Sequence, residues 1–258
     1  FGSTTIFAGA LARTFVDLPV FNIPTWFLMC LVSVEFLHYF AFRHLKQSDG
    51  RILAAMVVFF LAGFAFTWKF DLFNSGKPFS GNVWFIHEAV LMYAFYLLGV
   101  LLRRRDFLVG QVSTPLLATG AVVALAMVYF TYDLNQGPFR LIQAVIIVAS
   151  GHGHMFWFVF TALAGTLLIL LLARLTPPLK VLTFLGQNAL ILFCLNGVFY
   201  HSINGPVAAW TLKTYPETPW AVFGVGVGLS TVSLALCVPV IYLLNTHLPW
   251  ALGKAKKT

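Results

Sequence analysis

Seven strongly apolar runs, separated by polar gaps, follow one another along this chain. A helix needs about 20 apolar residues to cross a hydrocarbon core of roughly 30 Å, and each run has about that length. The pattern predicts an all-α, polytopic bundle of transmembrane helices over residues 23–246, in one domain that spans residues 1–258. The predicted spans are Ile23–Phe42, Ile52–Trp68, Val83–Leu102, Pro115–Tyr132, Met155–Ala173, Val181–Tyr200 and Ala221–Leu244.

The basic residues predict the direction in which the spans run. Of the 16 Lys and Arg residues, 11 lie in every second gap and in the C-terminal tail. They are Arg43, Lys46, Arg51, Arg103, Arg104, Arg105, Arg174, Lys180, Lys254, Lys256 and Lys257. Because cytoplasmic loops carry an excess of Lys and Arg, these gaps are expected in the cytoplasm. Residues 1–22 then form an external leader, and residues 247–258 form a cytoplasmic tail.

The composition is that of a membrane protein and argues against a nucleic-acid partner. Hydrophobic residues make up 60% of the chain and charged residues 9%, whereas soluble proteins average about 25% charged residues. The net charge of +8 is spread over the ends of the spans, where basic side chains anchor the topology and meet anionic lipid. The expected partner is therefore the lipid bilayer.

One apolar stretch, Leu141–Ala149, is too short to cross a bilayer. It is followed by the sequence Gly151-His152-Gly153-His154. The stretch is either an interfacial or re-entrant segment, or the extension of a long helix that is broken at the glycines. Either arrangement leaves the predicted direction of the spans unchanged.

Polar residues gather at one predicted level of the membrane. Such a cluster, drawn from three different spans, is typical of a site at the outer mouth of a helix bundle, although interfaces also tolerate polar side chains because water is near. The histidines and their neighbours at this level are His87, Glu88, Asp133, His152, His154, His201 and Asn204. We expect no metal here, because the His152-x-His154 pair has no thiolate or carboxylate partners at a fixed spacing.

Two ionisable residues lie deeper, in the inner half of the first span. Glu35 and His38 are three residues apart and so share one helix face. Ionisable groups at this depth are costly and usually face a partner or a cavity. The pair is predicted to be buried, either as a mutually satisfied structural pair or as a functional relay.

Four short stretches carry a resemblance to a known family. Phe184–Leu192 reads Phe-Leu-Gly-Gln-Asn-Ala-Leu-Ile-Leu, and Asn196–His201 continues this pattern. Pro24–Leu28 contains Trp-Phe-Leu, and the run Val83–Leu102 contains Phe-Tyr-Leu-Leu-Gly before its arginines. Together these stretches resemble the acyltransferase-3 family, integral membrane O-acyltransferases that modify sugars.

The resemblance implies a function and a set of residues that carry it. The expected reaction moves an acyl group, most simply acetyl, from cytoplasmic acyl-CoA to a sugar hydroxyl of a glycan at the cell surface or in the periplasm. Acyl-CoA is then a co-substrate, the glycan is the acceptor, and no bound cofactor is expected. The expected catalytic residues are His87, Glu88 and His201. The expected substrate-binding residues are Trp26, Trp84, His152, His154, Asn188, Asn196 and Asn204, and the candidates for the CoA phosphates are Arg103, Arg104 and Arg105.

The chain also departs from the family pattern. Members have about ten spans, and their first span carries an Arg followed about ten residues later by the His that acts as the general base. The chain shows no such pair, so we expect it to be a fragment of a bacterial inner-membrane protein that lacks this His. Asn196 stands where many members have a His. Succinyl transfer to periplasmic glucans is a variant of this reading, and a transporter or flippase that uses Glu35 and His38 is the alternative. The oligomeric state stays open.

Overall fold

A computed structural model describes residues 25–46, 48–71, 79–80, 83–106, 110–137, 145–214 and 218–252. Six helices in this part of the chain are long and apolar enough to cross a membrane, and they confirm six of the seven predicted spans. The chain is a polytopic helical membrane protein. The contacts of the described residues group them into two compact units, residues 26–177 and residues 178–252, and each unit is described separately.

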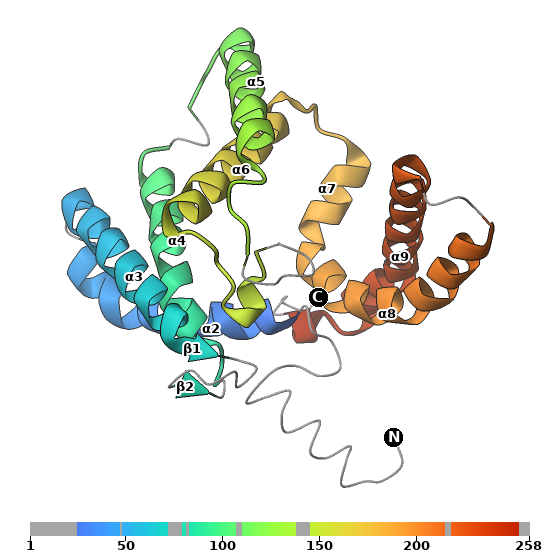
Figure 1. The fold of residues 1–258 in the computed structure, drawn as a ribbon, viewed down its shortest axis with the longest axis horizontal. Helices are drawn as coiled ribbons and strands as arrows, with labels where there is room; N and C mark the ends of the chain where they lie inside the picture. The colour runs from blue at the N-terminus through green and yellow to red at the C-terminus, as the bar shows by residue number, and fades with distance from the viewer. Residues whose placement is uncertain are drawn as a thin grey trace, which may run out of the picture. The chain divides into compact units, whose positions relative to one another are not determined.

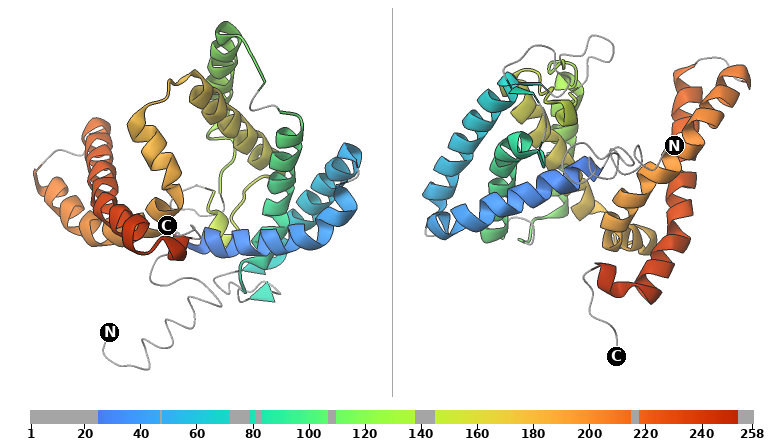
Figure 2. Two further views of the ribbon diagram at one scale, coloured as in Figure 1. Left: turned by 180° about the vertical axis from the view of Figure 1, so that it is seen from behind. Right: turned by 90° about the horizontal axis from the view of Figure 1, so that it is seen from below.

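The first unit contains a group of three packed helices, α2 (Trp26–Leu45), α3 (Asp49–Lys69) and α4 (Ile86–Arg104). Helices α3 and α4 lie side by side in Figure 1 and in both views of Figure 2. They run in opposite directions, because Asp49 at the start of α3 meets Arg105 at the end of α4. A buried core joins the three helices and is made of Cys30, Val34, Ile52, Phe85, Ala89, Tyr93 and Leu97.

A second pair of helices in this unit is formed by α5 (Thr114–Thr131) and α6 (Met155–Leu175), which also lie side by side (Figure 1). Pro115 stands in the first turn of α5, where a missing N–H costs no hydrogen bond. Between α5 and α6 the chain makes a short 3₁₀ turn, η2 (Ile147–Ala149), closed by a bridge between Ile146 and Gly151. The described part of Leu141–Ala149, residues 145–149, is therefore a tight turn and not an α-helix, and the rest of the stretch lies outside the described residues.

Two very short strands, β1 (Phe70–Asp71) and β2 (Phe79–Ser80), pair in parallel between α3 and α4. They mark the end of the first unit at which α3 ends and α4 begins (Figure 1). The same end carries the first turn of α6, because His152, just before α6, contacts Glu88 in the first turn of α4. Helix directions thus bring together residues that are far apart in the sequence.

The second unit consists of α7 (Lys180–Gln187), α8 (Ala189–Thr214), α9 (Pro219–His247) and η3 (Pro249–Leu252). Helices α8 and α9 pack through Ile191, Leu192, Cys237 and Ile241. The predicted span Val181–Tyr200 needs a correction, because it is broken at Asn188 and continues to Thr214 as α8. The Asn188 amide donates to the carbonyl of Phe184 (2.9 Å), a bond that closes α7 at the break.

Candidate functional site

The start of α4 is held in an unusual backbone conformation. Trp84 and Phe85 both have left-handed φ angles, 50° and 51°, which are uncommon for non-glycine residues and cost of order 1–3 kcal/mol each. Two contacts with α2 hold this turn in place. The Ser33 hydroxyl donates to the carbonyl of Trp84 (2.7 Å), and the buried Phe85 ring lies 5.4 Å from the ring of Trp26. The two residues that follow, His87 and Glu88, are thereby fixed in the first turn of α4.

Glu88 is the centre of a buried polar network. Its side chain is 0% exposed, and that of His152 is 3% exposed. The ring Nε2–H of His152 donates to Oε2 of the carboxylate (2.9 Å), and the Ser150 hydroxyl donates to Oε1 (2.7 Å). Nε2 of His87 lies 3.8 Å from Oε1. Each oxygen of this carboxylate therefore has a donor, as a buried charge requires.

The position of Glu88 on its helix also favours a negative charge. It lies in the first turn of α4, where backbone N–H groups and the helix dipole stabilise anions. A carboxylate in such a place holds the orientation of an imidazole that donates to it, and it stabilises the imidazolium that forms when the ring takes a second proton. The Glu88–His152 pair thus has the arrangement of an imidazole base with a carboxylate that orients it.

The loop that carries His152 is fastened at its backbone. The Asn135 side chain reaches it with both ends of its amide: Nδ2 donates to the carbonyl of His152 (3.1 Å), and Oδ1 accepts from the N–H of His154 (2.8 Å). Gly153 between them has a φ of +70°, and an added Cβ would meet the Asn135 side chain. Glycine is therefore required at this position, and the fastened loop fixes where His152 stands.

A polar pocket of about 700 Å³ opens beside this network. We call it the polar pocket, and it lies between the end of α3, the turn after α5 and the loop before α6. Its polar side chains are Thr67, Gln136, Ser150, His152 and His154, and its apolar wall includes Leu61, Phe64 and Met155. Two members of the Glu88 network, Ser150 and His152, line it directly. The pocket has room for a small polar substrate next to the imidazole.

A comparison with protein families identifies the family of this chain. A family model for the acyltransferase-3 group, described as an acyltransferase domain, matches residues 2–242. The chain belongs to the acyltransferase-3 family. Comparisons with curated proteins and with solved structures gave no match. The family assignment confirms the resemblance carried by the four short stretches, and it makes the protein a membrane acyltransferase.

In this acyltransferase the structure brings together four of the residues predicted at the outer mouth. His87, Glu88, His152 and His154 lie at the same end of the first unit, which we call the histidine end. His87 and Glu88 come from α4, whereas the other two come from the loop before α6. The side chains of His201, Asn196 and Asn204 lie outside the described part of the chain, and their roles stay predictions.

The predicted buried pair Glu35–His38 needs a correction. Glu35 is exposed on α2, and His38 is half-buried. Each reaches a tyrosine on α4: the Tyr96 hydroxyl donates to Glu35 Oε1 (3.0 Å), and His38 Nδ1 lies 3.3 Å from the Tyr93 hydroxyl. Tyr93 and Tyr96 are three residues apart, as are Glu35 and His38, so the two pairs meet across the interface between α2 and α4. The two side chains therefore serve as cross-helix contacts.

The three arginines predicted to bind the CoA phosphates lie at the opposite end of the first unit. Arg105 binds Asp49 with two guanidinium nitrogens (2.9 and 2.7 Å), and Arg104 lies 3.5 Å from the other carboxylate oxygen. Arg103 is exposed in the last turn of α4. We call these four residues the arginine end. The histidines of the candidate site and these three arginines thus lie at opposite ends of α4.

The other predicted substrate-binding residues have packing roles in the structure. Trp26 is half-buried against Phe85, and Trp84 lies 6.3 Å from Phe36. Neither lines the polar pocket in the described part of the chain. Asn188 is buried in the second unit, where its Oδ1 accepts from Nδ2 of Asn245 (3.0 Å). Its amide stabilises the break between α7 and α8.

Sequence reasoning missed Ser150 and Asn135 of the buried network, and Thr67 and Gln136 of the polar pocket. Ser150 directly precedes the Gly-His-Gly-His stretch, and this position was a signal that it shares the loop with His152. Asn135 lies 17 residues before His152, so its part in holding the loop could be found only from the folded chain. Among the described residues, no three His, Cys, Asp or Glu side chains are arranged to hold a metal ion.

Proposed function

We propose that this acyltransferase moves an acyl group, in the first instance acetyl, from cytoplasmic acyl-CoA to a sugar hydroxyl of a surface or periplasmic glycan, in the inner membrane of a bacterium. The family assignment supports acyl transfer in general. The observation that carries the finer proposal is the buried Glu88–His152 pair on the wall of the polar pocket. We assign the sugar to this pocket.

The chemistry needs a group that takes the proton of the acceptor hydroxyl. The hydroxyl oxygen forms a bond with the thioester carbonyl carbon, the carbon–sulfur bond breaks, and the CoA thiolate leaves and takes up a proton. His152 stands in the pocket wall with Glu88 behind its Nε2 atom. The pair binds the acceptor beside its reacting hydroxyl and is able to accept the proton, while His87 and His201 are further candidates for contacts with the acceptor.

The polar pocket has the chemistry that a sugar ring requires. Sugars present hydroxyl groups that both donate and accept hydrogen bonds, and the side chains of Thr67, Gln136 and Ser150 can do the same. His154 adds a second imidazole to the pocket wall. These groups line a site that is large enough for one or two sugar rings, and we assign His154 to binding rather than to proton transfer.

The phosphates of the acyl donor are assigned to the arginine end, and the CoA arm has to extend from there along the helices to bring the thioester to the polar pocket. Guanidinium groups match phosphate oxygens in geometry and charge, and acyl-CoA carries several phosphates. Arg103 is exposed there, and Arg104 and Arg105 share the single carboxylate of Asp49. Because the arginine-rich gaps are expected in the cytoplasm, this placement also puts the donor on the side where acyl-CoA is made.

The test substitutes the central pair in the full-length protein. Glu88→Gln and His152→Asn should each lower acylation of the cell-surface glycan by at least about a hundredfold, because general acid–base catalysis contributes about that much. His44→Asn is the matched control, since His44 is exposed in the last turn of α2, away from the network. Glycan acylation is measured by mass spectrometry, with expression checked in membranes.

The outcome separates the two possible roles of the pair. If both variants acylate the glycan as well as His44→Asn does, the assignment of the pair to the acceptor is wrong. A rise in the KM for the acceptor with an unchanged kcat would show that the pair binds the sugar without moving its proton. A loss of kcat supports the proton-transfer role.

A further inference from the structure

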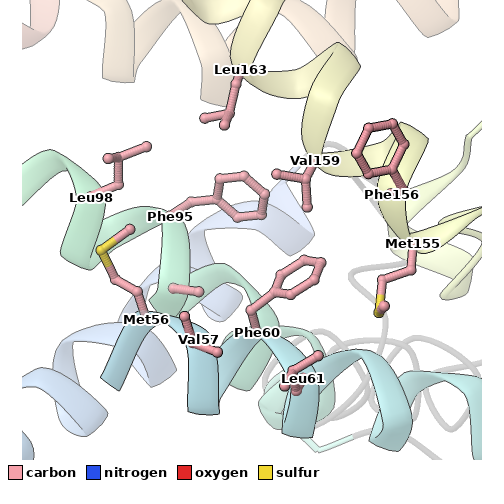
Figure 3. Close-up of a pocket in the computed structure, with 11 residues that line it drawn as sticks. Met56, Val57, Phe60, Leu61, Phe95, Leu98, Met155, Phe156, Val159 and Leu163 are labelled. Carbon is pink, nitrogen blue, oxygen red and sulfur yellow. The ribbon is translucent and has the colours of Figure 1, made fainter. Parts of the chain in front are cut away.

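A second cavity, of about 370 Å³, lies among α3, α4 and α6 (Figure 3). We call it the apolar pocket, because every residue that lines it has a hydrocarbon or thioether side chain. Burying a polar group in such a lining without a partner is unfavourable, because the group loses its hydrogen bonds to water. The lining therefore selects a hydrocarbon. It includes Val57, Phe60, Phe95, Leu98, Val159 and Leu163, all labelled in Figure 3.

The apolar pocket adjoins the polar pocket. Leu61 on α3 and Met155 at the start of α6 line both of them. The two cavities are thus neighbours, with the polar one at the histidine end and the apolar one further along the same helices. A ligand that fills both has a polar head and a hydrocarbon tail.

The direction of the apolar pocket matches that of a lipid tail. On α6 it extends from Met155, the first residue of the helix, to Leu163. Eight residues of helix correspond to about 12 Å, which reaches from one side of a hydrocarbon core of roughly 30 Å to near its middle. A lipid whose head group lies at the histidine end has its hydrocarbon tail over this same range of depth.

The size and the opening of the apolar pocket also suit a chain. Its volume is about 370 Å³, whereas an engineered protein cavity of about 150 Å³ binds benzene, so a chain on the order of ten carbon atoms fits. Val57 and Phe156 on its wall are 58% and 59% exposed. On a membrane-spanning helix such residues face the lipid, so a chain can enter sideways from the bilayer.

We infer that the acceptor of this acyltransferase is a glycolipid of the membrane, with its sugar in the polar pocket and its hydrocarbon chain in the apolar pocket. The inference rests on the proposed function for the identity of the head group. The acceptor is favoured over the acyl donor as the source of the chain, because the apolar pocket adjoins the polar pocket, to which the sugar is assigned. Only the phosphates of the donor are assigned to the arginine end.

The experiment uses full-length protein in lipid nanodiscs and a probe with a glucose head, an eight-carbon chain and a diazirine at the end of the chain. Light should attach the probe to peptides from α3, α4 and α6, and octyl glucoside should compete. Val57→Trp fills the apolar pocket and should lower this labelling by about tenfold. Val58→Trp, the matched control, changes a neighbour that is 63% exposed and not part of the pocket lining, and should keep it.

Labelling that is spread evenly over the lipid-facing helices and unchanged in Val57→Trp would overturn the inference. The proposed function is tested separately by acylation of the glycan in cells. If the cells acylate their glycan and the two tryptophan variants acylate it equally well, the chain site is wrong and the acyltransferase proposal stands. If wild-type cells acylate no glycan although the probe labels the pocket, the proposed function is wrong and so is the acceptor assignment.

Discussion

Replacing Gly63 with alanine tests the closest approach between two helices of the first unit. Gly63 on α3 lies against the backbone of α4, and a Cβ added there would be 2.5 Å from the N atom and 2.6 Å from the Cα atom of Leu91. Carbon atoms that are not bonded prefer separations of about 3.5–4.0 Å. The clash involves backbone rather than a flexible side chain, so α3 has to move away from α4 by about 1 Å.

This displacement has a calculable cost. Forcing extra carbon into a packed core costs roughly 1–3 kcal/mol, and contact with a rigid backbone places Gly63→Ala at the upper end of this range. Alanine itself favours a helix over glycine by about 1 kcal/mol, which offsets part of the loss. The net destabilisation of about 2 kcal/mol should lower the melting temperature by about 4–8 °C in a unit of this size.

The assay is thermal unfolding of the purified full-length protein in detergent, followed by size-exclusion chromatography. Gly99→Ala is the matched control, because a Cβ at Gly99 on α4 meets nothing within 4 Å. That variant should keep or raise the melting temperature, since it gains only the helix preference of alanine. Equal melting temperatures for the two variants would refute the close approach of α3 and α4.

Three further substitutions test other parts of the structure. Gly153→Ala should abolish most acylation and also lower the melting temperature, because its positive φ and the Asn135 side chain force the loop to move; full activity with an unchanged melting temperature would contradict the fastened loop. Ser33→Ala leaves the carbonyl of Trp84 without its hydroxyl donor and should cost about 1–3 kcal/mol of unfolding free energy, which thermal unfolding would detect or exclude. Asp49→Asn removes the ion pair between Asp49 and Arg105 at the surface, so its small effect on the melting temperature should vanish in high salt, and a salt-independent loss would refute this.

The spans could be predicted from the sequence because the bilayer imposes a length on them. The predicted run Met155–Ala173 matches α6, which begins at the same residue and ends at Leu175. The break at Asn188 could not be predicted, since a single asparagine in an apolar run has no effect on length or composition. It is stabilised by Asn245, 57 residues further along the chain.

The candidate site could be predicted only in part, because some of its contacts depend on how the helices pack. Grouping His87, Glu88 and His152 needed only the alternating direction of the spans, and the structure places them together. The partners within the group depend on the fold. Glu35 and His38 have a spacing that suggests a pair, yet both contact tyrosines on another helix, which no local pattern reveals.

The two asparagines at the break between α7 and α8 tie distant positions of the sequence to one another. Asn245 Nδ2 donates both to Asn188 Oδ1 (3.0 Å) and to the carbonyl of Ile241 (2.9 Å). Losing one member of a buried hydrogen-bonded pair is costly, whereas exchanging both for apolar residues of the same shape is close to neutral. Natural variants of this acyltransferase should therefore keep both asparagines or lose both. Substitutions at positions 188 and 245 should accordingly be correlated among related sequences.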